Sequence, residues 1–273
     1  GGEDEIEERP LRRVKSDNQL QVYAVNGGAL AQEWSITTRE VGTKGTLDYR
    51  LFFDHKKLGH ISPWHDIPLH GRESTYHFLC EIPKWSRAKF EISVDEDWNP
   101  IKQDESKGDV RVYKHGDMLF NYGLFPQTWE DPEHIDKSTG CRGDNDPLDC
   151  IEVGTRQMTT GQIEAVKVLG ILAMIDDNET DWKVITIRAD DVMAPHMDDI
   201  GDLEREIPGC VTAIREWLRN YKVAEGKGQN RFALNDEAMN ASFAVQVIQE
   251  THQHWRSKYA SKQKLQIDID EIM

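Results

Sequence analysis

The sequence predicts an α+β fold, mainly β, in which a closed antiparallel barrel has helices packed against it. Three observations support this prediction. Short β-rich runs separated by turn signals fill most of the chain up to residue 189, helical spacing appears only after Asp198, and strands do not alternate with helices. Because strands come first and helices last, an antiparallel sheet is favoured over repeated βαβ units.

The predicted strands are short runs rich in β-branched and aromatic residues. They cover residues 20–25, 46–53, 76–83, 88–94, 110–113, 149–153, 165–175 and 181–189. The predicted helices come from apolar residues that repeat at spacings of three and four. One helix carries Val211, Ile214, Leu218 and Tyr221, and the next carries Phe243, Val247, Ile248 and Trp255.

The composition is that of a globular protein, with 38% hydrophobic residues and eight tryptophans to build a core. Lys and Arg number 33 and Asp and Glu number 49, so 33 − 49 gives a net charge of −16. This charge disfavours nucleic acid and anionic membranes as partners. The longest apolar run, residues 165–175, is too short to cross a bilayer, so no membrane association is expected.

The acidic residues 1–33 are predicted to form an N-terminal extension, and residues 34–273 a single folded domain. The cysteines form no C-x-x-C pair, and no signal peptide is recognisable. We therefore expect reduced thiols in a cytoplasmic protein, with the nucleus as the alternative compartment. The thiols belong to Cys80, Cys141, Cys150 and Cys210.

The segment "GDNDPLDC" (143–150) places Asp144, Asp146 and Asp149 within six positions around a proline. Carboxylates this close raise each other's pKa unless they point into water or surround a cation. An EF-hand is excluded, because Asp149 stands where that loop needs glycine and Thr155 where it needs glutamate. An acidic surface turn remains the alternative to a metal site.

A second acidic turn, "MIDDNETDWKV" (174–184), ends the next apolar strand and places Asp176 and Asp181 beside Lys183. Both turns adjoin strands, as a site at the mouth of a barrel requires. Several carboxylates with few histidines between them favour a hard cation, so Mg²⁺ or Mn²⁺ is expected rather than zinc. The ten histidines show no H-E-x-x-H or comparable zinc spacing.

Cations held by carboxylates need an anionic substrate, and basic residues lie near the acidic ones. Lys89 and Glu91 are two positions apart on a predicted strand, so they point to the same face. Taken singly, Lys89, Arg111, Lys183 and Lys222 are better explained as solvated surface cations. Only their joint occurrence beside acidic partners predicts an anion site.

A series of motifs gives a more specific indication: "HDIPL", "EIPKW", "NPIKQD", "NYG", "PQTWEDP", "GDNDPLD", "ETDWKV" and "YK", in this order. With these motifs the chain resembles the family I soluble inorganic pyrophosphatases, whose signature is D-x-D-P-x-D, and in particular their eukaryotic branch. The resemblance runs from about Ser35 to Trp255. It implies a five-stranded OB-like closed barrel with flanking strands and C-terminal helices, and a homodimer. Trp85 would either contribute to the dimer interface or cap the barrel.

The resemblance also implies a role for each candidate site residue. The ligands of two tightly bound metals that share the nucleophilic water would be Asp144, Asp149 and Asp181. Asp176 and Glu91 would help to hold further metals, with Glu81 in the same cavity, and Asp146 would accept the proton of the attacking water. The groups that grip the two phosphates would be Lys89, Arg111, Lys183, Tyr221 and Lys222, with Tyr122 in the same pocket. Tyr122 and Tyr221 fit core aromatics equally well on sequence pattern alone.

These roles imply Mg²⁺-dependent hydrolysis of inorganic pyrophosphate to two phosphates. A water bridged between two divalent cations is acidic enough to be hydroxide near neutral pH, and it would attack directly and in line. Lysine and arginine side chains would stabilise the charge that spreads over the phosphate oxygens, without a covalent intermediate.

Two other classes of protein compete with this prediction. A noncatalytic scaffold that keeps the fold would be expected to have lost metal ligands, yet every ligand placed here is Asp or Glu. A metal-dependent nucleotide or polyphosphate hydrolase would need a groove for the base. A P-loop NTPase is excluded, because the sequence contains no G-x-x-x-x-G-K-[ST] motif.

The chain departs from the family between Arg111 and "NYG" (121–123), where the family has a longer segment with a second active-site tyrosine. Asp117 and Met118 stand where that tyrosine would fall. Either Tyr113 supplies the hydroxyl from a different backbone position, or the site works without it and Met118 packs against the barrel mouth.

Overall fold

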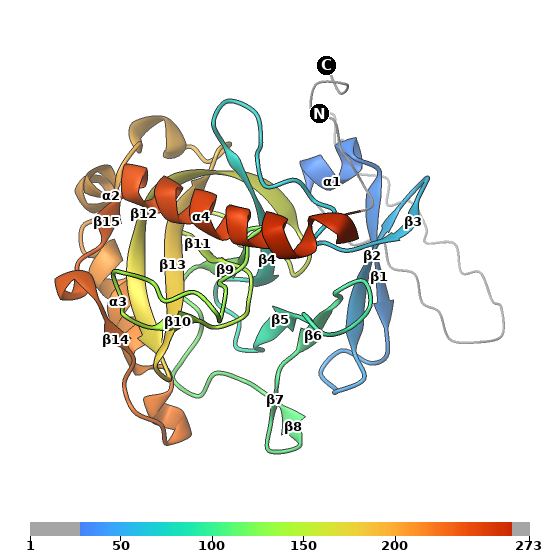
Figure 1. Ribbon diagram of the computed structural model, residues 1–273, viewed down its shortest axis with the longest axis horizontal. Helices are drawn as coiled ribbons and strands as arrows, with labels where there is room; N and C mark the ends of the chain where they lie inside the picture. Colours follow the sequence, from blue (N-terminus) through green and yellow to red (C-terminus); the bar gives the residue numbers. More distant parts are fainter. Residues whose placement is uncertain (1–27, 264–273) are drawn as a thin grey trace, which may run out of the picture.

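The carboxyl-terminal part of the protein is mainly helical, whereas most of the chain before it forms strands (Figure 1). The computed structural model describes residues 28–263. The α-helices that follow the long strands are α2 (Ile200–Glu206), α3 (Cys210–Asn220) and α4 (Ala241–Tyr259). Apart from the short helix α1 (Ala29–Glu33), the predicted order of strands first and helices last is confirmed. Helix α1 lies within the predicted extension, and the boundary between extension and domain stays a prediction.

The central sheet is built around a long antiparallel hairpin of β12 (Ile163–Asp176) and β13 (Glu179–Arg188). From β13 the pairings run on to β11 (Asp149–Glu152), β9 (Asn121–Leu124) and β4 (Tyr76–Ile82), and from β4 back to β12. Within this circuit β11 and β13 run parallel, which the expected antiparallel arrangement did not include. The chain reverses direction into β12 and again into β13, so β13 points the same way as β11.

Shorter strands extend this sheet and form a second sheet beside it. Along the edges of the central sheet lie β10 (Arg142–Gly143), β14 (Arg231–Phe232) and β15 (Met239–Asn240). The second sheet contains β1 (Ile36–Val41), β2 (Arg50–His55), β3 (Gly59–Ile61), β5 (Phe90–Ile92) and β6 (Ile101–Gln103). A small hairpin consists of β7 (Glu105–Ser106) and β8 (Asp109–Val110). The 3-10 helices are Ala194–His196, Val223–Glu225, Leu234–Asp236 and Ala260–Lys262.

Some predicted strands differ from the observed ones. The strand expected at 20–25 lies outside the described residues. The strand expected at 46–53 begins only at Arg50, because the chain turns before it and the Thr46 N–H donates to the Thr43 carbonyl at 3.1 Å. The strand expected at 110–113 is reduced to the end of β8 and a single bridge at Val112.

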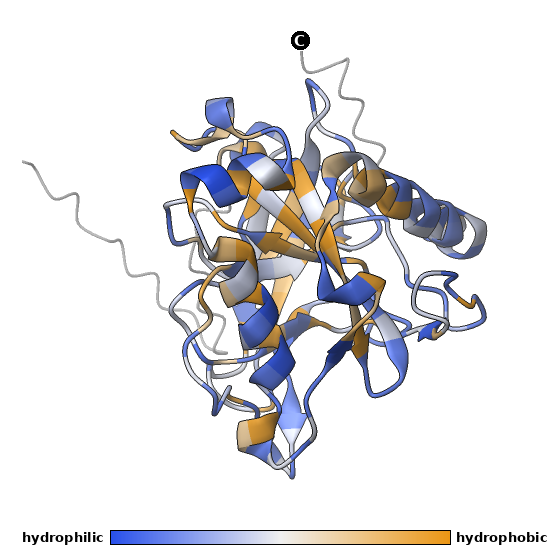
Figure 2. Cartoon of the chain, turned by 90° about the vertical axis from the view of Figure 1, so that its left-hand side faces the viewer, coloured by the Kyte–Doolittle hydropathy of each residue, from blue (hydrophilic) through white to orange (hydrophobic). Residues whose placement is uncertain are grey.

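Helix α4 crosses the central sheet (Figure 1) and packs against β12. Its predicted apolar stripe is confirmed for Val247, Ile248 and Trp255, which are buried, while Phe243 is half-buried. The Asn240 side chain caps the helix by accepting a hydrogen bond from the Phe243 N–H at 2.9 Å. Figure 2 shows the hydrophobic residues concentrated on the central strands and the hydrophilic ones toward the outside of the helices.

Helix α3 also follows its predicted pattern, because Val211, Ile214 and Leu218 are buried, and Tyr221 just beyond its last turn is buried too. The four cysteines are free. None of the helices in residues 28–263 combines the length and the apolarity needed to cross a membrane.

Candidate active site

The three aspartates of "GDNDPLDC" lie where the chain passes from β10 into β11. Backbone hydrogen bonds tie this turn to the preceding loop: the Asn145 N–H donates to the Glu130 carbonyl at 3.0 Å, and the Glu130 N–H to the Asp146 carbonyl at 2.9 Å. Gly143 is needed for this approach, because a Cβ there would lie 2.4 Å from the Glu130 carbonyl carbon. The Asp146 N–H also donates to Asp144 Oδ1 at 3.0 Å. The positions of the aspartates are therefore fixed by the backbone around them.

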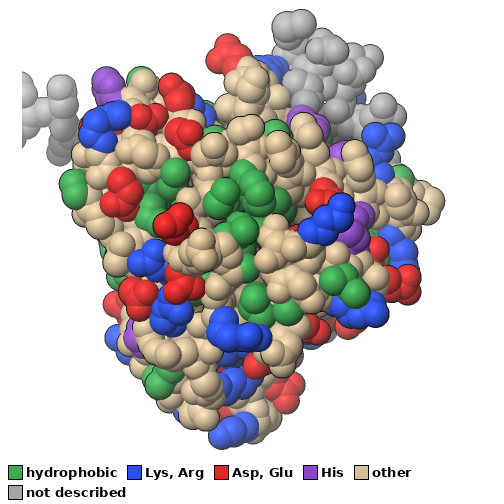
Figure 3. Space-filling view, turned by 60° about the vertical axis from the view of Figure 1, so that its left-hand side comes forward, with side chains coloured by type: hydrophobic (Ala, Val, Ile, Leu, Met, Phe, Trp, Pro, Cys, Tyr) green, Lys and Arg blue, Asp and Glu red, His purple; other side chains and the backbone are tan. Residues whose placement is uncertain are grey.

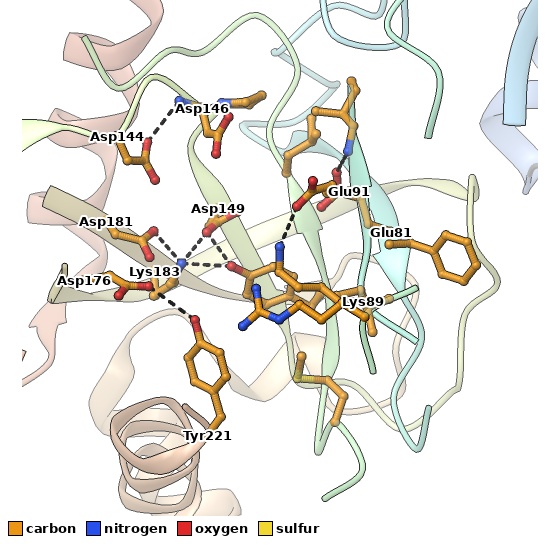
Figure 4. Close-up of a pocket in the computed structure, with 18 of the residues that line it drawn as sticks. Glu81, Lys89, Glu91, Asp144, Asp146, Asp149, Asp176, Asp181, Lys183 and Tyr221 are labelled. Carbon is orange, nitrogen blue, oxygen red and sulfur yellow. Dashed lines mark hydrogen bonds and ion pairs between the residues drawn. The ribbon is translucent and has the colours of Figure 1, made fainter. Parts of the chain in front are cut away.

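The acidic turn forms one wall of a cavity of about 300 Å³ (Figure 4). All the candidate site residues from the sequence line it: Glu81, Lys89, Glu91, Arg111, Tyr122, Asp144, Asp146, Asp149, Asp176, Asp181, Lys183, Tyr221 and Lys222. Asp95 and Lys102 line it as well, so that eight carboxylates and five cationic side chains of the described chain surround one space. The sequence therefore identified a set of residues that meet, whereas their individual roles stay predictions.

Lys183 lies at the centre of the ion pairs in this cavity (Figure 4). Its ammonium donates to the carboxylates of Asp149 and Asp181 and, at 2.8 Å, to the Tyr122 hydroxyl, which itself donates to Asp149. Asp149 and Lys183 are direct neighbours across the parallel pair of β11 and β13. Burial alone would lower the pKa of Lys183, but Asp149 and Asp181 raise it well above its ordinary value. Lys183 is therefore held as a buried cation.

A second group of contacts surrounds Asp176, the last residue of β12. The Tyr221 hydroxyl donates to Asp176 Oδ2 at 3.3 Å, and the Lys222 ammonium pairs with Asp176 and, at 3.0 Å, with Asp177. Tyr221 also stacks on Trp217, with ring centroids 5.3 Å apart. Tyr221 thus fills core and faces the cavity at the same time, because it follows directly after the last turn of α3.

Lys89 and Arg111 also line the cavity and are held by carboxylates. The predicted contact on one strand face is confirmed, since Lys89 Nζ lies 2.5 Å from Glu91 Oε2. Asp104 bridges the two cations, at 3.0 Å from Lys89 and 2.9 Å from Arg111, and Glu225 lies 2.9 Å from Arg111. Burial alone would lower the pKa of Lys89, but its carboxylate neighbours, Glu91 first, raise it well above its ordinary value.

The pKa values of three aspartates in the cavity are raised, which favours their protonated forms. Burial and the neighbouring Asp181 raise the pKa of Asp144 well above its usual range. Burial and Asp149 raise the pKa of Asp146 to about 7. Burial raises the pKa of Asp181 to about 8, although Lys183 opposes the shift. Positive charge brought into the cavity would favour the ionised carboxylates again.

Glu130, which was not among the candidate residues from the sequence, completes the acidic cluster. Its carboxylate, with those of Asp144 and Asp181, offers ligand atoms that all lie within 4.8 Å of one another. The Trp182 N–H donates to Glu130 Oε1 at 3.1 Å, while buried Glu130 Oε2 has no hydrogen-bond partner within residues 28–263. An oxygen-only donor set with an unpartnered oxygen fits a hard divalent cation. Glu130 stands in the "PQTWEDP" motif, which was the available signal.

Asp104 and Glu225 were also missed. Asp104 ends the "NPIKQD" motif, and its role as a bridge between Lys89 and Arg111 depends on side chains that meet only in the fold. Glu225 follows the "YK" motif in a 3-10 helix, and nothing in the sequence pattern connects it to Arg111.

Tyr113 and Met118 both line the cavity. Both explanations of the missing tyrosine therefore remain possible: Tyr113 supplies the hydroxyl, or Met118 packs at the mouth of the site. The buried ring of Tyr113 meets Trp217 and Tyr221 edge-on, with centroids 5.1 and 5.6 Å apart. Burial raises the pKa of Tyr113, which keeps its hydroxyl protonated and able to donate. Whether Tyr113 replaces the missing hydroxyl stays a prediction.

Comparisons with known proteins identify the family of the chain. Residues 78–256 match the model of the inorganic pyrophosphatase family. The chain is 48% identical over 221 residues to the inorganic pyrophosphatase of Mus musculus, which covers 80% of this chain and 76% of the mouse protein. The solved inorganic pyrophosphatase from T brucei brucei has a TM-score of 0.79 and 45% identity, covering 83% of this chain and 71% of that chain.

A second solved structure, the N-terminal domain truncated vacuolar soluble pyrophosphatase of Trypanosoma cruzi in complex with PPi, has a TM-score of 0.78 and 44% identity. That match covers 89% of this chain and 98% of the other. With a family match over more than half of the chain and relatives of this identity, the chain belongs to the inorganic pyrophosphatase family and hydrolyses inorganic pyrophosphate to two phosphates.

Proposed function

We propose that this pyrophosphatase works with several divalent cations, principally Mg²⁺, and that water attacks pyrophosphate directly and in line. The observation that carries the proposal is the cavity of about 300 Å³, around which eight carboxylates and five cationic side chains of the described residues meet. The excess of carboxylate suits hard cations, and the cationic side chains suit phosphate oxygens. Mn²⁺ fits the same oxygen donors.

The carboxylates that would hold the cations form two groups. Asp144, Asp149 and Asp181 would hold the most tightly bound cations, because they converge from both acidic turns. Those that would hold further cations are Asp176, Glu91 and Glu81. Among these, Glu81 already accepts a hydrogen bond from the Ile92 N–H at 2.6 Å, which orients its carboxylate. When bound, the cations supply charge neutralisation of the phosphates and make a nearby water more acidic.

Asp146 is the residue we assign as general base. It lies between Asp144 and Asp149 in sequence and lines the cavity, so a water close to those carboxylates is also close to Asp146. In the proposed step a water oxygen forms a bond to one phosphorus while the bond from that phosphorus to the bridging oxygen breaks. The proton of the water passes to Asp146, and the second phosphate leaves with the electron pair of the broken bond.

The phosphates would be gripped by groups that now pair with carboxylates. They are Lys89, Arg111, Lys183, Tyr221 and Lys222, with Tyr122 beside them. Each of the basic side chains in this group now pairs with a carboxylate. An entering phosphate would take the place of that carboxylate, and a bound divalent cation would neutralise the carboxylate's charge. Charge developing on the phosphate oxygens would then meet preorganised donors in a partly dehydrated site.

We propose that the strands around this site form a five-stranded OB-like closed barrel. The circuit of pairings from β13 through β11, β9, β4 and β12 supports it, since a sheet that returns to its first strand has no free edge there. The cavity would then lie at one end of the barrel, where the acidic turns adjoin β11, β12 and β13.

We also propose a homodimer in the cytoplasm. Trp85 supports an interface, because its side chain is 60% exposed although it is a large apolar group. The free cysteines support a reducing compartment such as the cytoplasm, and the nucleus fits equally. Pyrophosphate is the proposed partner rather than nucleic acid, as acidic, basic and apolar side chains are interspersed over the face drawn in Figure 3.

Phosphate release from pyrophosphate, ATP and tripolyphosphate, each with Mg²⁺ and with EDTA, tests this proposal. We expect rapid release from pyrophosphate with Mg²⁺ and none with EDTA. Faster release from ATP or tripolyphosphate would instead identify a nucleotide or polyphosphate hydrolase. Release that persists in EDTA would contradict the role given to the cations.

A further inference from the structure

A second cluster of potential ligand side chains lies outside the active-site cavity, between α4 and the loop of residues 131–141. It consists of His134 on the loop and of Glu250 and His254 on the helix. One ligand atom from each of these residues lies within 4.8 Å of the other two. Glu250 and His254 are four positions apart on α4 and therefore project from the same side of the helix. Helix and loop thus bring three donors together that no short sequence motif connects.

One distance in this cluster matches that between two ligands of one ion. His134 Nε2 lies 3.4 Å from Glu250 Oε1, and the rings of His134 and His254 have centroids 4.8 Å apart. With bond lengths of about 2.0 to 2.1 Å, two ligand atoms of a tetrahedral zinc ion lie about 3.3 Å apart. The pair formed by His134 and Glu250 is therefore already at ligand separation, without a rearrangement of the backbone.

His254 has an unused donor or acceptor atom in this place. Its Nδ1 atom is buried and has no hydrogen-bond partner within the described chain. A buried ring nitrogen without a partner is unfavourable, and it is relieved when the imidazole binds a proton donor or a metal. The surrounding hollow, of about 20 Å³, has room for about one water molecule or ion. Glu130, Asp131 and Asp136 also line it, and their carboxylates favour a cation there.

We propose that His134, Glu250 and His254 form a second metal site, which binds Zn²⁺ or a similar borderline transition metal. Two imidazoles and one carboxylate are a donor set that such ions prefer, whereas Mg²⁺ prefers oxygen ligands only. Water would complete the coordination, because three protein ligands leave a fourth position open. The site thus differs in chemistry from the oxygen-lined cavity.

An ion in this site would connect the loop of residues 131–141 to α4. That loop leads directly into β10 and the acidic turn. Glu130 lines the hollow beside His254 and also belongs to the acidic cluster with Asp144 and Asp181. Zinc binding would therefore stabilise the support of the active-site aspartates and raise the thermal stability of the protein. The ion would take no part in hydrolysis itself, since Glu130 separates the two clusters.

Equilibrium dialysis with Zn²⁺ at saturating Mg²⁺ tests this proposal on the full chain. We expect His254→Gln to bind one Zn²⁺ fewer per chain than the wild type, and Glu250→Gln to bind it more weakly. His196→Gln, at an exposed histidine outside the cluster, is the matched control and should bind as many ions as the wild type. Glu250 is an exposed residue, so its variant keeps the test available if His254→Gln folds poorly.

Thermal unfolding with and without Zn²⁺, again at saturating Mg²⁺, is the second readout. We expect Zn²⁺ to raise the unfolding temperature of the wild type and of His196→Gln, but not that of His254→Gln or Glu250→Gln. Equal Zn²⁺ stoichiometry and affinity in the wild type and both cluster variants would overturn the proposal. An equal rise in unfolding temperature in all four proteins would overturn it as well.

Discussion

The active-site cavity and the rest of the core both bury polar side chains, but they satisfy them in different ways. In the core, the Trp255 indole donates to His65 Nδ1 at 2.9 Å, and His77 Nδ1 donates to the Pro68 carbonyl at 2.7 Å. Burial lowers the pKa of His65 to about 3 and that of His77 to about 4, so both rings are neutral. Each of these two rings has a neutral hydrogen-bond partner.

The cavity instead gathers charges that do not balance within the described residues. Lys183 there pairs with both Asp149 and Asp181, and eight carboxylates stand against five cationic groups. Buried charges are costly unless they are paired, so an excess of carboxylate weakens the fold on its own. The difference indicates that the core groups serve stability, whereas the cavity groups are arranged for ligands that bring positive and negative charge.

Removing one carboxylate from the cavity should have the largest effect. We expect Asp149→Asn to lower kcat for pyrophosphate at saturating Mg²⁺ by roughly a thousandfold or more, about 4 kcal/mol, because a shared ligand of the cations is lost. The variant should still fold, because asparagine keeps the shape of the side chain. Asp198→Asn, at a surface carboxylate that is 81% exposed, is the matched control and should keep the wild-type rate. A near-wild-type rate for Asp149→Asn would remove Asp149 from the metal site.

Removing the general base should have the next largest effect on kcat. We expect Asp146→Asn to lower kcat by roughly a hundredfold, about 3 kcal/mol, with a smaller change in KM, as is typical when a general base is lost. Steady-state kinetics in Mg²⁺ measure both constants. A variant impaired in KM alone would show that Asp146 only helps to bind the substrate.

In the core, the neutral histidines should make the free energy of unfolding depend on pH. The unfolded chain protonates His77 near its usual value of 6.5, whereas the folded protein protonates it only near pH 4. Between these values the unfolded state binds the extra proton, so the free energy of unfolding falls as the pH is lowered. From pH 7 to pH 5 the loss should be about 2 kcal/mol for His77.

Urea unfolding of the wild type and His77→Gln at both pH values measures this effect. Glutamine keeps a hydrogen-bond donor but does not titrate, so the variant should lose about 2 kcal/mol less between pH 7 and pH 5. Identical pH dependence in the two proteins would mean that His77 is not protonated on unfolding in this range.

The smallest expected effect concerns the hydroxyl that distinguishes this chain within its family. Tyr113→Phe keeps the ring contacts with Trp217 and Tyr221 and removes only the oxygen. If Tyr113 supplies the missing hydroxyl, kcat should fall by roughly tenfold, about 1.4 kcal/mol, close to the value of one hydrogen bond to a charged group. A silent Tyr113→Phe together with an impaired Tyr122→Phe would mean that the site works without the second tyrosine.

The strand-first pattern predicted the fold class because the long strands carry strong signals. The apolar run at 165–175 became most of β12, and the run at 181–189 became most of β13. Strands such as β3 and β6 were missed because three residues are too few to show a period of two. The parallel pairing of β11 and β13 depends on the path of the chain in space, which periodicity does not report.

The candidate site was predicted well where sequence neighbours are also neighbours in space. Lys89 directly precedes β5, and it meets Glu91 because residues two apart in an extended chain share a face. Glu130 and Glu225 were missed because their partners, Asp144 and Arg111, are reached only through tertiary packing. The second cluster, of His134, Glu250 and His254, was not predicted for the same reason. The lack of a zinc motif in the sequence does not exclude it, because its residues meet only in the fold.

The stability gained from Mg²⁺ tests most directly whether the crowding of the cavity carboxylates is offset by cations. Urea unfolding of the wild type and Asp149→Asn would be compared in EDTA and at saturating Mg²⁺. At about a hundred times the dissociation constant, Mg²⁺ should stabilise the wild type by about 3 kcal/mol and the variant by less than half of that. Equal stabilisation of both proteins, or none of the wild type, would contradict this account of the cavity.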